Sequence, residues 1–218
     1  QLDIPARADV ADAAADVAPA PTDGQKEAGN YRKGHTSVQG VPVTIETVKG
    51  SLRKGKNREG TEWQVEMPAH YGYIKRTEGA DGDHVDVYVG DNPSAENVYV
   101  VDQINHDDQT FDEHKSLLGF PSQEAAIQAY QAAFSDGKGP ARMGGVTTMS
   151  VQKFKAWLKK PGARKAPLAW KKPEPAPAAE PAQPPAQTQA IDNKPEDSAQ
   201  TPPAQPAAQP ETQAEEPE

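Results

Sequence analysis

Three aspartates within a six-residue segment are the side chains in this chain best suited to chemistry. Asp81, Asp83 and Asp86 lie in the sequence Asp-Gly-Asp-His-Val-Asp-Val, where Gly82 permits a tight turn between the first two. Carboxylates this close repel one another unless a divalent cation lies between them, and oxygen donors favour Mg²⁺, Mn²⁺ or Ca²⁺ over Zn²⁺. The spacing indicates a metal site with Mg²⁺ as the expected ion, although such clusters are also typical of solvated turns.

The spacing does not fit an EF-hand calcium loop. Counted from Asp81, that loop needs an oxygen ligand at its fifth position, a glycine at its sixth and a glutamate at its twelfth. The chain has Val85, Asp86 and Asn92 at these positions. The EF-hand alternative is therefore excluded.

The residues around the aspartates predict the elements that must position them. Val85, Val87 and Val89 alternate with polar residues, which predicts a strand that holds Asp86 on its polar face. The same reasoning predicts the following further elements: a strand at 41–46, a hairpin with a cationic tip at 49–67, strands at 98–104 and 111–118, and helices that begin after Ser122 and Ser150. Strands first and helices last indicate an α+β domain.

The segment Tyr-Gly-Tyr-Ile, followed by a polar turn and Asp-Gly-Asp-x-Val-Asp-Val, resembles the signature of the soluble family I inorganic pyrophosphatases. Residues 41–120 carry the resemblance, and residues 25–160 are similar to the pyrophosphatase-like domain of large multidomain proteins of phages and mobile elements. The resemblance implies an α+β fold, a small OB-like β-barrel flanked by two C-terminal helices. The chain departs from the family pattern at His84, where proline or glutamate is usual.

The resemblance also implies that the chain hydrolyses pyrophosphate to two phosphates. The attacking water would be activated by Mg²⁺, with Mn²⁺ as the possible substitute. The residues expected to bind metal are Asp81, Asp86, Asp107, Asp112 and Glu46. The residues expected to act in catalysis are Asp83, which would accept the proton of the water, with Tyr71 and Lys115. The residues expected to bind the substrate are Lys49, Arg53 and Arg58.

Two parts of this implied site stay open. The family's phosphate-binding arginine has no match at its expected place, and Arg58 and Arg53 are the two candidates. One extra residue separates Asp112 from Lys115, and on a strand Asp112 and His114 share one face while Lys115 takes the other. Periodicity and resemblance therefore disagree over whether His114 or Lys115 faces the site.

Composition predicts one domain, at residues 25–162, between two tails. Residues 1–24 are rich in Ala, Asp and Pro, and residues 163–218 are rich in Pro, Ala, Gln and Glu, so both segments are expected to be disordered. Because nine acidic residues face three lysines in 171–218, the acidic net charge of −9 belongs to the tails. The central part therefore lacks the basic field of a nucleic-acid-binding protein.

Other features bear on the setting of the chain. It has no cysteine, which excludes disulfides and thiolate metal sites, and no apolar run approaches the length of a membrane span. We expect a cytoplasmic protein, encoded by a phage or prophage in a bacterial host. A homo-oligomer is possible, and the missing initial methionine favours part of a larger polyprotein or a processed product.

Three alternatives to pyrophosphate hydrolysis remain open from the sequence. The first is a catalytically degenerate module that binds a metal or a phosphorylated ligand within a phage protein, which the residue at His84 and the unmatched arginine favour. The second is a hydrolase of another phosphoanhydride, such as a nucleoside diphosphate derivative. A purely structural domain ranks last because it leaves the spacing of the acids unexplained.

Overall fold

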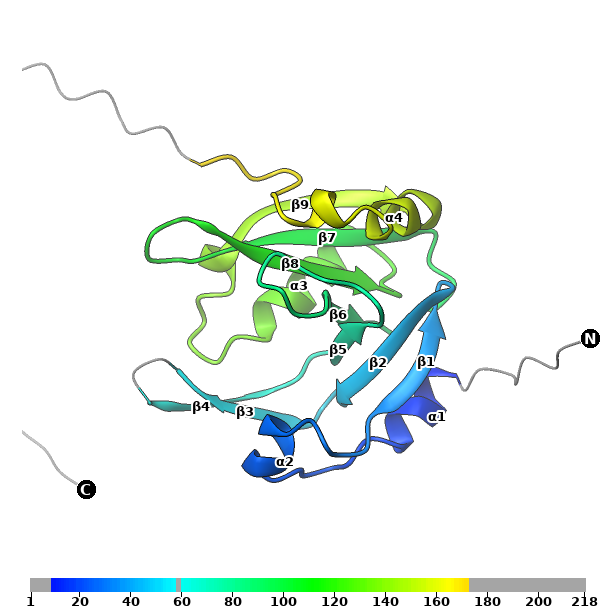
Figure 1. Ribbon diagram of the computed structural model, residues 1–218, viewed down its shortest axis with the longest axis vertical. Coiled ribbons are helices and arrows are strands. Elements are labelled where there is room, and N and C mark those ends of the chain that lie inside the picture. Colours follow the sequence, from blue (N-terminus) through cyan, green and yellow to red (C-terminus); the bar gives the residue numbers. More distant parts are fainter. Residues whose placement is uncertain (1–8, 58–59, 173–218) are drawn as a thin grey trace, which may run out of the picture. The chain divides into compact units, whose positions relative to one another are not determined.

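The computed structural model describes residues 9–57 and 60–172 (Figure 1). The strands are β1 (Gly34–Val38), β2 (Val41–Thr47), β3 (Leu52–Lys56), β4 (Glu62–Glu66), β5 (His70–Ile74), β6 (Asp86–Val89), β7 (Asn97–Ile104), β8 (Phe111–Leu118) and β9 (Met143–Ser150). The helices are α1 (Val10–Ala15), α2 (Asp23–Glu27), α3 (Gln123–Ala132) and α4 (Val151–Leu158), with short 3-10 helices η1 (Pro140–Arg142) and η2 (Pro161–Arg164). None of the helices in these ranges has the length and apolar character needed to cross a membrane.

Seven strands form the main sheet, in the order β1-β2-β5-β6-β8-β7-β9, while β3 and β4 form a separate hairpin. Strands β6 and β8 run parallel, with Asp86 opposite Lys115, whereas the pairs on either side of them are antiparallel. Mostly β structure with two helices near its C-terminal end confirms the predicted α+β, OB-like class. The β6–β8 pairing is the feature that places acidic and basic side chains side by side.

The strand residues alternate between two apolar clusters because successive side chains point to opposite faces of a sheet. Val87 and Val89 of β6 pack in one cluster with Phe154 and Trp157 of α4. Tyr88, between those valines, packs in the other cluster, which also holds the following residues: Tyr71, Tyr99, Leu117, Ala126 and Tyr130. Helices α3 and α4 therefore cover different faces of the sheet, each with an apolar stripe against it.

The N-terminal segment is ordered where the structure describes it. Asp9 caps helix α1 by accepting a hydrogen bond from the backbone of Asp12 at 2.8 Å. Ala13 and Val17 are buried in the same cluster as α4. The prediction that residues 1–24 are disordered is therefore wrong for residues 9–24, because small apolar side chains of a short helix pack against β1 and β2.

The chain also remains packed beyond residue 162. Arg164 is buried, and the backbone N–H groups of Leu168, Ala169 and Trp170 donate to the carboxylate of Asp102. Packing thus extends past both predicted bounds of the domain, 25 and 162. The remainder of the predicted tail, 173–218, lies outside the described residues.

Gly72 marks a close approach of β5 to β2. A Cβ atom at this position would lie 1.9 Å from the carbonyl oxygen of Thr44, so an alanine requires the two strands to separate. We expect Gly72→Ala to lower the free energy of unfolding by about 3 kcal/mol, measured by chemical denaturation. Gly24→Ala is the matched control, because no atom other than those of its chain neighbours and its own helix backbone lies within 4 Å of its Cβ position. Equal denaturation midpoints for the two variants would contradict the prediction.

Candidate functional site

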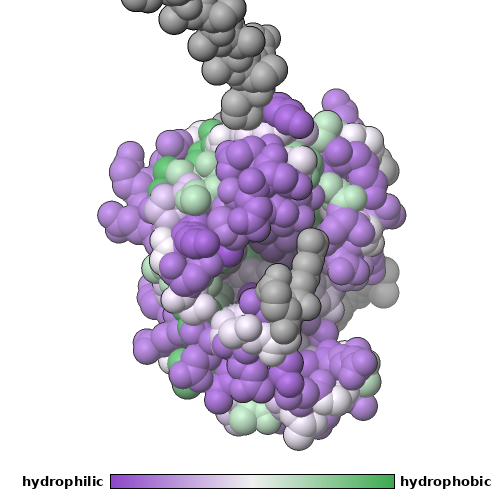
Figure 2. Space-filling model, turned by 90° about the vertical axis from the view of Figure 1, so that its left-hand side faces the viewer, coloured by the Kyte–Doolittle hydropathy of each residue, from purple (hydrophilic) through white to green (hydrophobic). Residues whose placement is uncertain are grey.

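A polar cavity of about 770 Å³ lies between the β3–β4 hairpin and the strands β5 to β8. Figure 2 shows the hollowed face on this side of the molecule, with mostly hydrophilic walls. Four charged side chains from the three strands β3, β6 and β8 line its inner part, namely Arg53, Asp86, Glu113 and Lys115. The end of α3 and the segment before β9 form the opposite rim, with Lys138 and Arg142. The cavity therefore brings cations and carboxylates together in one hydrogen-bonding space.

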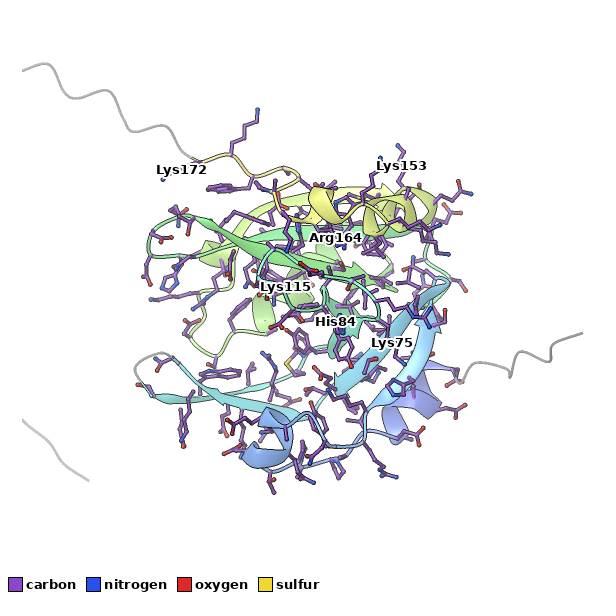
Figure 3. All side chains as sticks on the ribbon, viewed as in Figure 1. Lys75, His84, Lys115, Lys153, Arg164 and Lys172 are labelled. Carbon is purple, nitrogen blue, oxygen red and sulfur yellow. The ribbon has the colours of Figure 1, made fainter. Side chains whose placement is uncertain are left out.

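Lys115 is the central cation of this cavity (Figure 3). Its ammonium group contacts the carboxylate of Asp86, and its Nζ lies 2.7 Å from Oε1 of Glu113. Burial opposes the charge, but the surrounding Tyr71, Asp86 and Glu113 outweigh burial and hold the pKa of Lys115 well above its usual value. Lys115 is therefore a permanent positive charge.

Glu113 shares the strand face of Lys115. Burial raises the pKa of Glu113 to about 7, against the lowering effect of Lys115 and with a further rise from Asp86. Lys115 is shared between two carboxylates, and its favourable effect on ionised Glu113 is smaller than the opposing effect of burial. The side chain of Glu113 therefore binds a proton more tightly in the folded protein than an exposed glutamate does.

Tyr71 and Arg53 complete the inner wall. The hydroxyl of Tyr71 donates to Oδ2 of Asp86, and burial raises the pKa of Tyr71, so the hydroxyl stays protonated. The guanidinium of Arg53 stacks 4.4 Å from the centre of the Tyr71 ring and 5.4 Å from that of Trp63. Aromatic faces thus hold Arg53, and within the described part of the chain no side-chain acceptor is hydrogen-bonded to its N–H groups, so they can bind an anion such as a phosphate.

The structure decides between His114 and Lys115. His114 lies on the opposite face of β8 from Lys115, fully buried, with its Nε2 atom 3.2 Å from Oδ1 of Asp102 and its ring against Trp157 at 5.1 Å. The alternation along β8 predicted that these two residues face opposite ways, and the position of Lys115 agrees with the resemblance. Lys115 faces the cavity.

Some of the other residues expected at the site also line this cavity. Asp107 lines the rim of the cavity. The Nε2 atom of His106 lies 3.1 Å from Oδ1 of Asp107 and 3.2 Å from Nζ of Lys138. Tyr71, Asp86 and Arg53 line it as described above. The sequence therefore identified residues on three sides of the cavity.

Several expected residues lie elsewhere. Glu46 pairs with Lys33 at 2.6 Å and lines a neighbouring cavity, because β2 turns it toward the N-terminal segment. Lys49 pairs with exposed Asp91 on the far side of the hairpin's base. Asp112 is exposed at an irregularity of β8 and does not line the cavity, although it accepts a hydrogen bond from Gln103, which does. Arg58 lies outside the described residues.

Asp81 and Asp83 are exposed on the loop between β5 and β6. Neither is among the described residues that line the cavity. The loop is closed by its own hydrogen bonds, since the backbone N–H of Asp83 donates to Oδ1 of Asp81 at 3.1 Å and that of Gly79 donates to the carbonyl of Asp83 at 2.6 Å. Of the three aspartates in the motif, the structure thus places Asp86 alone in the cavity.

Glu113 is the site residue that the sequence reasoning missed. It stands two positions before Lys115, and residues two apart on a strand share a face, so strand periodicity could have identified it. The expectation favoured Asp112 instead, which alternation places on the face of His114. Lys138 and Arg142 were also not among the expected site residues.

The donors present suit a hard divalent cation. Asp86 and Glu113 supply carboxylate oxygens on two strands at the bottom of the cavity, which is the chemistry that Mg²⁺ prefers. Within the described ranges, no group of three or more His, Asp or Glu residues is arranged to hold a metal ion. The loop that enters β6 carries Asp81 and Asp83 and is therefore the nearest source of further donors along the chain.

Comparison with known proteins gives one family and a set of structures. The inorganic pyrophosphatase family model matches residues 23–159, whereas no curated protein matches the chain. An inorganic pyrophosphatase from Coxiella burnetii is 15% identical, with 57% of this chain and 91% of that chain covered and a TM-score of 0.31. One from Neisseria gonorrhoeae is 19% identical, with 66% and 94% covered and a TM-score of 0.33.

Proposed function

The chain belongs to the inorganic pyrophosphatase family, and we propose that it hydrolyses pyrophosphate to two phosphates in a Mg²⁺-dependent reaction at the cavity around Lys115. The observation that carries this proposal is the convergence of Lys115, Asp86 and Arg53 in one cavity. Carboxylates bind the metal that a pyrophosphate anion requires, and the two cations bind phosphate oxygens. Family membership and cavity chemistry support the same reaction.

The residues that would hold Mg²⁺ are Asp86 and Glu113, joined by Asp81 from the preceding loop and by Asp107 at the rim. When bound, Mg²⁺ lowers the pKa of a coordinated water and so supplies a nucleophile near neutral pH. We assign Asp83 as the group that accepts the proton of this water. Mn²⁺ has a similar preference for oxygen donors and is the expected substitute.

The remaining cavity residues would bind the substrate and orient the groups that act on it. Arg53 presents a planar fork of N–H groups that matches phosphate oxygens, and its stacking on Tyr71 fixes the plane of that fork. Lys115 offsets the charge that develops on the leaving phosphate. Tyr71 orients Asp86 by donating to its carboxylate. The positions of Glu46, Lys49 and Asp112 lend no support to a role in this reaction.

A second candidate is a module that binds a phosphorylated ligand without turnover. The placement of Asp81 and Asp83 outside the cavity lining favours it, because a site with fewer carboxylates holds fewer metal ions. A third candidate is a hydrolase of another phosphoanhydride, which differs from the main proposal only in its substrate. Measuring turnover and ligand binding on the same protein distinguishes these two alternatives from pyrophosphate hydrolysis.

The test is phosphate release from pyrophosphate by the full chain, with Mg²⁺ and with a chelator. We expect metal-dependent turnover in the wild type and a loss of about 100-fold in Asp86→Asn, because one carboxylate oxygen donor is removed. Asp23→Asn is the control, since Asp23 lies exposed on α2 away from the cavity, and we expect it to leave turnover unchanged.

Absence of phosphate release from folded wild-type protein would overturn the hydrolase. If calorimetry then detects pyrophosphate binding, the binding module is the function. Release from a nucleoside diphosphate but not from pyrophosphate would instead change the substrate. Each result therefore selects one of the three candidates.

We also propose the wider setting that the sequence resemblance implies. The chain would be cytoplasmic and encoded by a phage or prophage, and it would form part of a larger polyprotein with homo-oligomers as a possible state. Mass analysis of the native protein tests the polyprotein, and sedimentation of the full chain tests the oligomer.

A further inference from the structure

Two basic residues that follow α4 contact the loop on which Asp81 and Asp83 lie. The Nε atom of Arg164 donates to the carbonyl oxygen of Glu78 at 2.7 Å. The Nζ atom of Lys165 donates to the carbonyl oxygen of Gly79 at 2.7 Å and lies 2.8 Å from Oε1 of Glu78. Figure 3 shows Arg164 above this loop, although the two segments are more than eighty residues apart in sequence.

Arg164 is itself held firmly by its own segment. It is 3% exposed, and its NH1 group donates to the carbonyl oxygen of Leu158 at the end of α4. The indole N–H of Trp157 donates to the carbonyl of Ala163 at 3.2 Å, next to Arg164 in the chain. A buried guanidinium is stable only when its donors find acceptors, so these carbonyl contacts fix its place.

The loop is fixed at its other end as well. The backbone N–H of Val85 donates to Oγ1 of Thr77 at 2.9 Å, and the backbone N–H of Ile74 donates to the carbonyl of Val85 at 2.9 Å. Strand β6 then begins at Asp86. Residues 80–84, which include both aspartates, therefore lie between the contacts at Gly79 and those at Val85.

We propose that Arg164 and Lys165 are positioning residues for the metal site, acting through the backbone at Glu78 and Gly79. This inference rests on the proposed function, because it concerns the loop that carries Asp81, proposed to join Asp86 in binding Mg²⁺, and Asp83, proposed to accept the proton of the water. Fixing both ends of the loop lowers the conformational entropy that the loop loses when a cation binds. The segment after α4 is thus a support of the active site.

The test compares full-length variants for Mg²⁺ affinity by calorimetry and for hydrogen exchange of the loop amides at residues 78–85. We expect Lys165→Ala and Arg164→Gln to weaken Mg²⁺ binding about 10-fold and to speed loop exchange, with turnover at saturating Mg²⁺ retained. Lys165→Arg, which keeps a donor, should restore most of the affinity. Lys153→Ala, on the exposed side of α4, is the control.

The outcomes separate this inference from the function on which it rests. Wild-type protein that binds no Mg²⁺ overturns both. If the wild type binds Mg²⁺ and Lys165→Ala changes neither the Mg²⁺ affinity nor the hydrogen exchange of the loop, only the inference is overturned. If Arg164→Gln fails to fold, Lys165→Ala still decides, because the side chain of Lys165 is 43% exposed and its loss leaves no buried charge.

Discussion

Lys115→Met is expected to lower pyrophosphate turnover by about 1000-fold and the free energy of unfolding by roughly 3–5 kcal/mol at pH 8. Methionine fills a similar volume but carries no charge. It leaves the carboxylates of Asp86 and Glu113, which both contact the ammonium group, without their buried partner. Removing one member of a buried ionic group lowers the free energy of unfolding by more than the whole group contributes to it. The reason is that the remaining charges stay buried without a partner.

The effect on stability depends on pH through Glu113. In the metal-free protein, burial raises its pKa from 4.5 to about 7, so the folded state binds this proton more tightly than the unfolded state does. The stability contributed by this group is present below pH 4.5 and is lost as the pH rises to about 7. Without Lys115 the pKa of Glu113 rises further, so we expect Lys115→Met to cost less stability at pH 5 than at pH 8.

Chemical denaturation with a chelator at pH 5 and pH 8 measures this difference, and phosphate release measures turnover. Lys153→Met provides the control for loss of a lysine at an exposed position of α4. A Lys115→Met protein that matches the wild type in stability at pH 8 would show that the ammonium group does not compensate the two carboxylates.

Asp102→Ala is expected to destabilise the protein by roughly 3–5 kcal/mol and to release the segment that follows η2. Asp102 is fully buried on β7. Its carboxylate accepts the backbone N–H groups of Leu168 at 3.1 Å, Ala169 at 2.6 Å and Trp170 at 2.8 Å. Alanine leaves these three donors without their acceptor, which is costly where water does not replace it.

The pH dependence of this effect has the opposite sign to that of Glu113. Burial opposes ionisation of Asp102, but the contact with His114 and the backbone N–H groups outweigh it and hold the pKa of Asp102 below its usual value. Its contribution to stability is therefore present above the unfolded pKa and is lost as the pH falls through the folded value. We expect Asp102→Ala to cost less at pH 3 than at pH 7.

Denaturation at both pH values and limited proteolysis of the segment 163–172 measure the two effects. Asp102→Asn keeps one acceptor oxygen and should lie between wild type and Asp102→Ala. Asp23→Ala removes a carboxylate that is almost fully exposed, and it should change neither quantity. Unchanged proteolysis in Asp102→Ala would mean that other contacts hold this segment.

The sequence by itself determined the class of fold and three of the residues that meet in the cavity around Lys115. Alternation predicted the strand with Asp86 and the opposite orientations of His114 and Lys115, because side chains on a strand alternate whatever the strand pairs with. Apolar stripes predicted α3 and α4 for the same local reason. The family motif placed Tyr71, Asp86 and Lys115 in one site, and the structure brings their side chains into contact.

Only the tertiary structure decided which neighbours these residues have. The parallel pairing of β6 with β8 places Asp86 opposite Lys115, 29 residues further along the chain. The carboxylate of Asp102 accepts hydrogen bonds from the backbone of residues 168–170, which composition had assigned to a disordered tail. Partners so distant in sequence depend on strand order and on how the chain returns over the sheet, and neither local periodicity nor composition encodes that path.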